Sequence, residues 1–233
     1  MDHGSWIRFP LSALPLPASP SALTVEDATD LSTLNAEHAY LHPMSWLAQK
    51  YLMLRGWTFV GQLPEERKAV IVAAPHTSNW DFPIFLAVAR YFGIKPHFLG
   101  KDALFKGVLG ILMRRWGGLP VDRSGPNEMV KSAAKHFDSA PEMFLVITPE
   151  GTRGAAKVWK SGFWRIADAA GVPVVMGFVD GATKTTGFGP TMYVNGDPHA
   201  FMEAVREFYE DINGLKPSKR TPMILASESE EDD

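Results

Sequence analysis

Two short polar segments carry the side chains best suited to chemistry, and the first of them pairs a histidine with an aspartate. His76 is followed five positions later by Asp81. A carboxylate that accepts a hydrogen bond from one imidazole nitrogen leaves the other nitrogen free to take a proton from a hydroxyl, which is what general-base catalysis requires. The pattern is therefore compatible with a base, His76, that is oriented by Asp81.

The spacing alone does not select this pair. His97 and Asp102 stand at the same separation and also follow an apolar run. Asp81 lies where a helix is expected to begin, so it fits a helix cap, and a histidine at the edge of the core satisfies the same pattern. From the pair alone, a structural role for His76 is favoured over a catalytic one.

The second polar segment is a turn of four residues, Glu150-Gly151-Thr152-Arg153. Gly151 permits a tight turn with a close approach of the backbone, and Arg153 carries a planar fork that suits phosphate oxygens. Thr152 adds a hydroxyl, and Glu150 adds a carboxylate that can orient the arginine or a hydroxyl. The segment is typical of a phosphate-binding turn, although an ordinary surface turn can have the same composition.

Both segments directly follow short apolar runs, and such runs alternate with amphipathic stretches along most of the chain. This alternation predicts one α/β domain, with a largely parallel mixed sheet flanked by helices. Loops at the carboxyl ends of strands carry the sites of such sheets, so the two segments are expected to meet at one edge. The expected strands cover residues 70–74, 97–100, 118–121, 143–148, 172–179 and 191–194, and the expected helices cover 79–92, 104–116, 127–137, 157–170 and 198–212.

The amino-terminal part of the chain divides into two segments. Residues 1–42 are rich in Pro, Ala, Ser and Leu and lack the basic-then-apolar pattern of a signal peptide, so we expect a loosely ordered extension. Residues 43–63 place Trp46 and Trp57 around Lys50, as an amphipathic helix in a membrane interface would. A helix packed on the core of the domain, residues 64–216, fits this segment equally well.

Composition and charge exclude several classes of protein. The chain has 233 residues, 45% of them hydrophobic, and no Cys, which excludes disulfides, a thiolate nucleophile and cysteine metal sites. No apolar stretch reaches the roughly 18 residues of a spanning helix. Five of the last six residues are acidic, so residues 217–233 are expected to form a disordered acidic tail. Basic residues prevail between Lys95 and Arg123, which could attract phosphate or anionic lipid.

Together and in this order, the two segments resemble the glycerolipid acyltransferase family, typified by 1-acylglycerol-3-phosphate acyltransferase. His76 and Asp81 match the HxxxxD block of the family. Residues 100–124 match the second block, whose arginine is Arg123; residues 149–153 match the third and residues 171–175 the fourth. The resemblance spans about residues 70–179 and rejects the pair of His97 and Asp102, which reaches into the second block.

The resemblance implies a direct acyl transfer. The donor would be a fatty acyl thioester of coenzyme A or acyl carrier protein, and the acceptor a phosphate-bearing lysolipid, by default 1-acylglycerol-3-phosphate, which gives phosphatidic acid. His76, held by Asp81, would take the proton of the acceptor hydroxyl. Residues 150–153 would bind the acceptor's phosphate, assisted by Arg123. No cofactor and no metal ion is implied.

The matched blocks leave the acceptor open, because the sequence departs from the family pattern at Pro75, at Thr148 and at Met176 with the following glycine. Glycerol-3-phosphate, a lyso-ornithine lipid and a glycolipid hydroxyl are all compatible. The runs 82–92 and 104–113 are candidate linings for an acyl chain, although core packing explains them equally well.

Three other classes of protein were weighed against an acyltransferase. A noncatalytic lipid-binding relative would keep the fold. A metal-dependent hydrolase could use His76 and Asp81 as ligands, but the chain lacks paired-His spacing such as HExxH. A nucleic-acid module is disfavoured by the acidic balance of charge. We expect a cytoplasmic protein that docks peripherally on the cytoplasmic face of a membrane.

Overall fold

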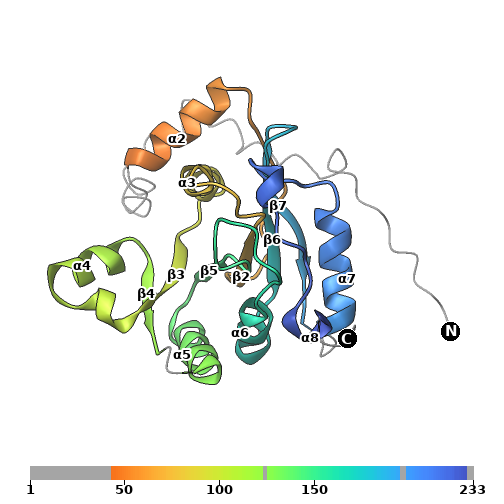
Figure 1. Cartoon of the computed structure of the whole chain (residues 1–233). Helices are drawn as coiled ribbons and strands as arrows, with labels where there is room; N and C mark the ends of the chain where they lie inside the picture. Colours follow the sequence, from red (N-terminus) through yellow and green to blue (C-terminus); the bar gives the residue numbers. More distant parts are fainter. Residues whose placement is uncertain (1–42, 123–124, 195–197, 230–233) are drawn as a thin grey trace.

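The computed structural model describes residues 43–122, 125–194 and 198–229, which form one seven-stranded sheet covered by helices on both faces (Figure 1). The order of strands is β1-β7-β6-β2-β5-β3-β4, and all neighbours are parallel except β6 and β7. The strands are β1 Thr58–Val60, β2 Lys68–Ala74, β3 Pro96–Lys101, β4 Gly118–Val121, β5 Met143–Ile147, β6 Val174–Asp180 and β7 Thr185–Met192. The predicted single α/β domain with a largely parallel mixed sheet is confirmed. The extension predicted for residues 1–42 lies outside the described residues.

The helices lie in two layers (Figure 1). α2 and α3 cover one face of the sheet, and α5, α6 and α7 cover the other. The α-helices are α2 Pro43–Leu54, α3 Asp81–Tyr91, α4 Gly107–Arg115, α5 Pro126–Ser139, α6 Gly162–Ala170, α7 Pro198–Tyr209 and α8 Ala226–Ser229, and the 3₁₀ helices are η3 Asp102–Phe105 and η4 Pro217–Lys219.

The central strand β2 contributes to both layers. Val70 and Val72 point into the core formed with α5, α6 and α7, whereas Ala69 and Ile71 point into the core formed with α2 and α3. All four side chains have no solvent exposure. A strand that is covered on both faces needs apolar residues at every position, which explains the uninterrupted run recognised in the sequence.

Helix α3 begins directly after the first polar segment. Its Ile84, Ala87 and Val88 are buried, at the spacing of one helical face. Pro83 falls in the first turn, where the backbone N–H groups have no intrahelical acceptor, so a proline is tolerated there. Packing of this face on the sheet therefore fixes the position of Asp81, the first residue of the helix.

Some elements differ from their predicted bounds. The three-residue strand β1 was not predicted, since so short a segment shows no alternation of its own. The last strand was expected at residues 191–194, but β7 covers Thr185–Met192, whose two glycines and proline weaken the strand pattern. Gly187 in β7 lies so close to β1 that a Cβ there would stand 2.0 Å from the Val60 carbonyl oxygen.

The carboxyl-terminal part of the chain is folded where a disordered tail was predicted. Residues 217–229 contain η4 and α8, and Thr221, Met223 and Leu225 are buried. Leu225 also forms a β-bridge with the buried Trp159. The acidic end misled the prediction, because the apolar residues that precede it pack on the core. Residues 230–233, which hold most of that charge, lie outside the described residues.

Helix α2 packs on the domain and also exposes apolar side chains. Ser45 and Leu52 are buried on its inner face, which lies against α3. The outer face presents five exposed side chains, Trp46, Leu47, Tyr51, Met53 and Leu54. Within the described ranges, no helix has both the length and the apolarity needed to span a membrane.

Candidate active site

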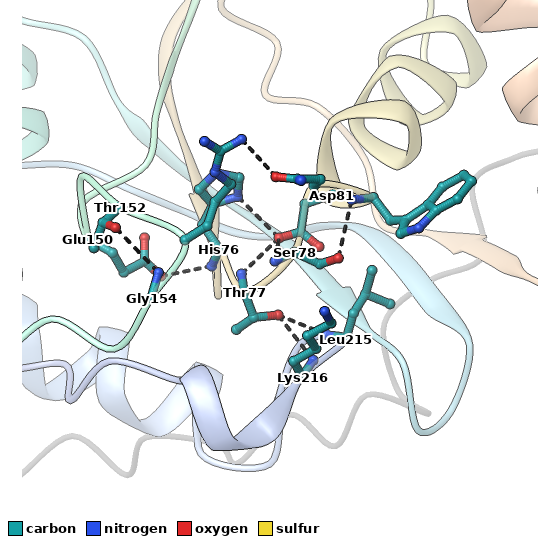
Figure 2. Close-up of polar contacts among 12 residues, drawn as sticks. His76, Thr77, Ser78, Asp81, Glu150, Thr152, Gly154, Leu215 and Lys216 are labelled. Carbon is teal, nitrogen blue, oxygen red and sulfur yellow. Dashed lines mark hydrogen bonds and ion pairs between the residues drawn. The ribbon is translucent and has the colours of Figure 1, made fainter.

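His76 and Asp81 meet at the carboxyl end of β2 (Figure 2). After Ala74 and a cis peptide bond to Pro75, the chain crosses a short loop before α3 begins at Asp81. His76 Nδ1 lies 3.1 Å from Asp81 Oδ2. The imidazole is 22% exposed and the carboxylate 8% exposed. The ring is thus held from below through Nδ1, which leaves Nε2 as the nitrogen available to exchange a proton with a substrate.

The Asp81 carboxylate is itself fixed by the loop. Its Oδ2 accepts hydrogen bonds from the backbone N–H groups of Thr77 and Ser78, both at 2.8 Å. The carboxylate also lies in the first turn of α3, where the helix dipole attracts an anion. These contacts leave the Asp81 side chain little freedom to turn away from the imidazole.

Glu150 supports the histidine rather than a substrate. Its side chain is 3% exposed, and its Oε1 accepts the backbone N–H of His76 at 3.0 Å. Burial raises the pKa of Glu150, while the His76 N–H acts in the opposite direction. The sequence predicts that this carboxylate orients the arginine of its own turn or a hydroxyl, but the hydrogen bond in the structure goes to the backbone of the catalytic loop.

The rest of the turn lies at the surface next to the catalytic loop. The Arg153 Nη1 donates a hydrogen bond to Asn79 Oδ1 at 2.7 Å, so the guanidinium is drawn toward the loop that carries His76. Thr152 Oγ1 accepts the backbone N–H of Gly154 at 3.3 Å (Figure 2). Gly151 adopts a φ of +65°, a conformation that favours glycine. Arg123, the arginine predicted from the second block, lies outside the described residues.

Lys160 is a further cation at this site, and the sequence did not point to it. Its backbone N–H donates to the Pro149 carbonyl at 2.9 Å, which folds the loop back on itself. Its ammonium fills the space that a side chain at position 151 would need, since a Cβ on Gly151 would lie 2.8 Å from Lys160 Nζ. No local pattern marks a lysine nine positions after the glycine, because only the folded loop brings the two together.

A cavity of about 800 Å³ connects these groups. His76, Arg153 and Lys160 line one part of it. The rest lies where β3 separates from β5: these strands pair only at Pro96–Phe144 and His97–Leu145, and further on β3 pairs with β4 alone. Apolar side chains of both strands and of α3 line this gap, among them Phe85, Leu86, Phe98, Leu99, Val146 and Ile147.

The cavity separates the two predicted acyl linings. Residues 82–92 contribute several side chains to it, whereas no described side chain of residues 104–113 does. In that second run Val108 is 85% exposed and Ile111 is 69% exposed. The alternation of apolar residues in α4 therefore marks an outward face and not the wall of the cavity.

The second His–Asp pair does not form a comparable site. His97 lies inside β3, and burial, followed by the nearby Lys95, lowers its pKa. Asp102 is exposed at the start of η3. Among the described residues, no group of three His, Asp or Glu side chains is arranged to hold a metal ion.

Comparison with known proteins defines the class to which this fold and site belong. A family model described as Acyltransferase matches residues 58–176, just over half of the chain, and this range includes both polar segments. The chain belongs to the acyltransferase family, and within it to the glycerolipid acyltransferases.

One solved structure has a similar fold, the 1-acyl-sn-glycerophosphate (LPA) acyltransferase PlsC from Thermotoga maritima. The similarity has a TM-score of 0.53 and 20% sequence identity, and it covers 77% of this chain and 79% of that chain. It therefore supports the fold. No curated protein matches this chain.

Proposed function

We propose that this acyltransferase moves a fatty acyl group from a thioester donor to the hydroxyl of a phosphate-bearing lysolipid. One observation carries the proposal: a histidine held by a buried carboxylate and an exposed arginine line the same cavity, linked through Asn79. A base and an anion-binding cation in one cavity suit an acceptor that has a hydroxyl and a phosphate a few bonds apart.

The transfer proceeds in one chemical step through a tetrahedral centre. Nε2 of His76 takes the proton of the acceptor hydroxyl while that oxygen attacks the thioester carbonyl. The carbon–sulfur bond then breaks, and the imidazolium returns the proton to the leaving thiolate. Asp81 stabilises the imidazolium while it exists. A chain without Cys has no thiolate with which to form an acyl-enzyme, and direct transfer needs none.

Two cations bind the phosphate in this proposal. Arg153 and Lys160 line the cavity, and no carboxylate among the described residues forms an ion pair with either of them. Both therefore remain available to a dianionic group. Fixing the phosphate also fixes the hydroxyl against His76, and such positioning supplies much of the rate of a two-substrate reaction. Arg123 is proposed to assist from the second block.

The apolar gap between β3 and β5 is proposed to take a fatty acyl chain. Its lining side chains come from three elements and enclose a space next to His76. An acyl chain there is shielded from water, and its thioester end reaches the base. Coenzyme A and acyl carrier protein are both suitable carriers for that thioester, and 1-acylglycerol-3-phosphate is the acceptor we propose, with phosphatidic acid as product.

The acceptor of such a reaction resides in a bilayer, so the protein must reach a membrane surface. Helix α2 exposes Trp46, Leu47 and Leu54, with Lys50 beside them. Interfacial helices combine apolar and basic side chains in this way. We propose that the outer face of α2 docks on the cytoplasmic face of a membrane, and that the protein is otherwise cytoplasmic.

The test is an acyl-transfer assay on the purified protein. Acyl-coenzyme A is mixed with 1-acylglycerol-3-phosphate, glycerol-3-phosphate, a lyso-ornithine lipid or a glycolipid, and the release of free thiol is followed. We expect the first acceptor to react and His76→Ala to be inactive. His199→Ala is the matched control, because His199 is exposed on α7 and does not line the cavity. A folded His76→Ala protein with full activity would refute the mechanism.

A further inference from the structure

Residues 213–216, which follow α7, lie directly beneath the catalytic loop (Figure 2). The Thr77 Oγ1 accepts two hydrogen bonds from this segment, one from Leu215 N and one from Lys216 N, each at 3.1 Å. Thr77 is 1% exposed, so its hydroxyl has no competing contact with solvent. The segment lies outside residues 58–176, the part of the chain that matches the family.

The segment has its own attachment to the sheet. Gly214 forms a β-bridge with Asp180 at the end of β6, and its carbonyl accepts the backbone N–H of Gly181 at 3.2 Å. Gly214 has a φ of +71°, and a Cβ there would lie 2.8 Å from Thr77 Oγ1 and 3.4 Å from Pro75 Cβ. The backbone of residues 213–216 therefore touches the catalytic loop with no space for a side chain between them.

Thr77 connects this segment to the reactive pair. Its backbone N–H donates to Asp81 Oδ2, the same oxygen that faces His76 Nδ1. Its side chain is bonded to residues 213–216 at the opposite end. Any rotation of Thr77 that broke the hydroxyl contacts would also move the N–H that holds the carboxylate.

We propose that Thr77 and residues 213–216 form a joint that positions the His76–Asp81 pair for catalysis. Thr77 is a positioning residue in this proposal, because its hydroxyl is engaged by backbone N–H groups and does not face a substrate. The proposal rests on the proposed acyl transfer as the reaction that reports on the geometry. It assigns a role to a segment of the chain that follows the matched family region.

The first test compares Thr77→Val with Thr77→Ser. Valine keeps the size of the side chain but leaves Leu215 N and Lys216 N without their acceptor, whereas serine keeps the hydroxyl. We expect Thr77→Val to lower kcat by about 10- to 100-fold, as small displacements of catalytic groups do, with KM within about twofold. Thr77→Ser should restore most of kcat. Equal kcat values for both variants would overturn the proposal.

The second test uses a pair of glycines. Gly214→Ala places a methyl group against Thr77, whereas Gly171→Ala, at a φ of +61° and with nothing within 4 Å of its Cβ, carries a similar backbone penalty in open space. Both variants are expected to lose some thermal stability. Only Gly214→Ala is expected to lose kcat, and a matching loss in Gly171→Ala would contradict a local effect on the catalytic loop.

A titration separates failure of this proposal from failure of the proposed function. The pKa of the His76 ring is measured by NMR in the wild type and in the four variants, without any substrate. We expect it to fall in Thr77→Val and Gly214→Ala, because a displaced Asp81 stabilises the imidazolium less, and to stay at the wild-type value in the two controls. An inactive wild type would refute the acyl transfer alone. An unchanged His76 pKa in Thr77→Val would refute the joint.

Discussion

Replacing Asp81 by Asn isolates the charge of the carboxylate from its shape. The side chain keeps an oxygen that can accept the N–H groups of Thr77 and Ser78, but it no longer carries the charge that faces His76 at 3.1 Å. Two unit charges at that distance attract each other by about 5 kcal/mol at an effective dielectric constant of about 20. Each 1.36 kcal/mol is a factor of ten in rate.

The full charge term would correspond to a loss of about 10³- to 10⁴-fold in kcat. Solvent reaches the ring of His76, which is 22% exposed and therefore partly screened, so we expect about 10³-fold. The asparagine amide also takes the place of Oδ1, which is buried and has no hydrogen-bond partner among the described residues. A donor left unpaired there costs about 1–3 kcal/mol of stability.

The assay measures kcat at saturating donor and acceptor, with the melting temperature recorded for each sample. Asp102→Asn is the matched control, since Asp102 belongs to the exposed second pair and should leave kcat unchanged. A folded Asp81→Asn enzyme that keeps more than about a third of the wild-type kcat would refute the assignment of Asp81 as the partner of the base.

Four other changes give separate expectations. Lys160→Gln should raise the KM for a phosphate-bearing acceptor by about tenfold with little change in kcat, because a charged hydrogen bond to the bound anion is lost, while Lys157→Gln, outside the cavity, should change neither. Glu150→Gln should remove a pH dependence: since burial raises the pKa of Glu150 in the folded state, the wild-type melting temperature should fall as the pH rises from the usual pKa of a glutamate through the raised one, and the variant should lack this fall. Val146→Phe narrows the gap between β3 and β5, so the ratio of activities with long-chain and short-chain acyl donors should fall by at least about tenfold, and an unchanged ratio would place the acyl chain elsewhere. Leu54→Glu, at an 87% exposed position of α2, should weaken binding to anionic vesicles in a flotation assay without lowering the melting temperature.

The convergence of the two polar segments was accessible from the sequence because it follows from the sheet. β2 and β5 are adjacent and parallel, with Val72 level with Ile147, so the loops after them must emerge side by side. Each loop also carries a recognisable local pattern of residues. The spacing alone left His76 open to a structural role, and only the second segment with its Arg153 favoured a catalytic one.

Contacts between distant parts of the chain were not accessible. Glu150 has its hydrogen bond to the His76 backbone because the loop after β5 folds beneath the loop after β2, and no local pattern records which way a carboxylate turns. The same limit hid the fold of the carboxyl-terminal segment. Thr221 accepts the Ala156 N–H, and Ile224 accepts the Trp159 N–H, across more than sixty positions of sequence.

The exposed side chains of α4 illustrate a different limit. An alternation of apolar and basic residues predicts an amphipathic helix, and Gly107–Arg115 is one. The pattern does not state what the apolar side faces. In this chain Val108 and Ile111 face outward, because η3 and α4 project beyond the outermost strand pair instead of covering the sheet.

The participation of β2 in both cores has a consequence for how this protein tolerates change. His76 stands two positions beyond the end of that strand, and Glu150 three beyond the end of β5. A slip of one residue between the strands would displace one loop against the other by about 3.3 Å and turn every β2 side chain toward the wrong layer. Misalignment of the two loops would thus be accompanied by loss of the folded state, and natural selection for solubility and expression alone would already maintain the reach between base and carboxylate.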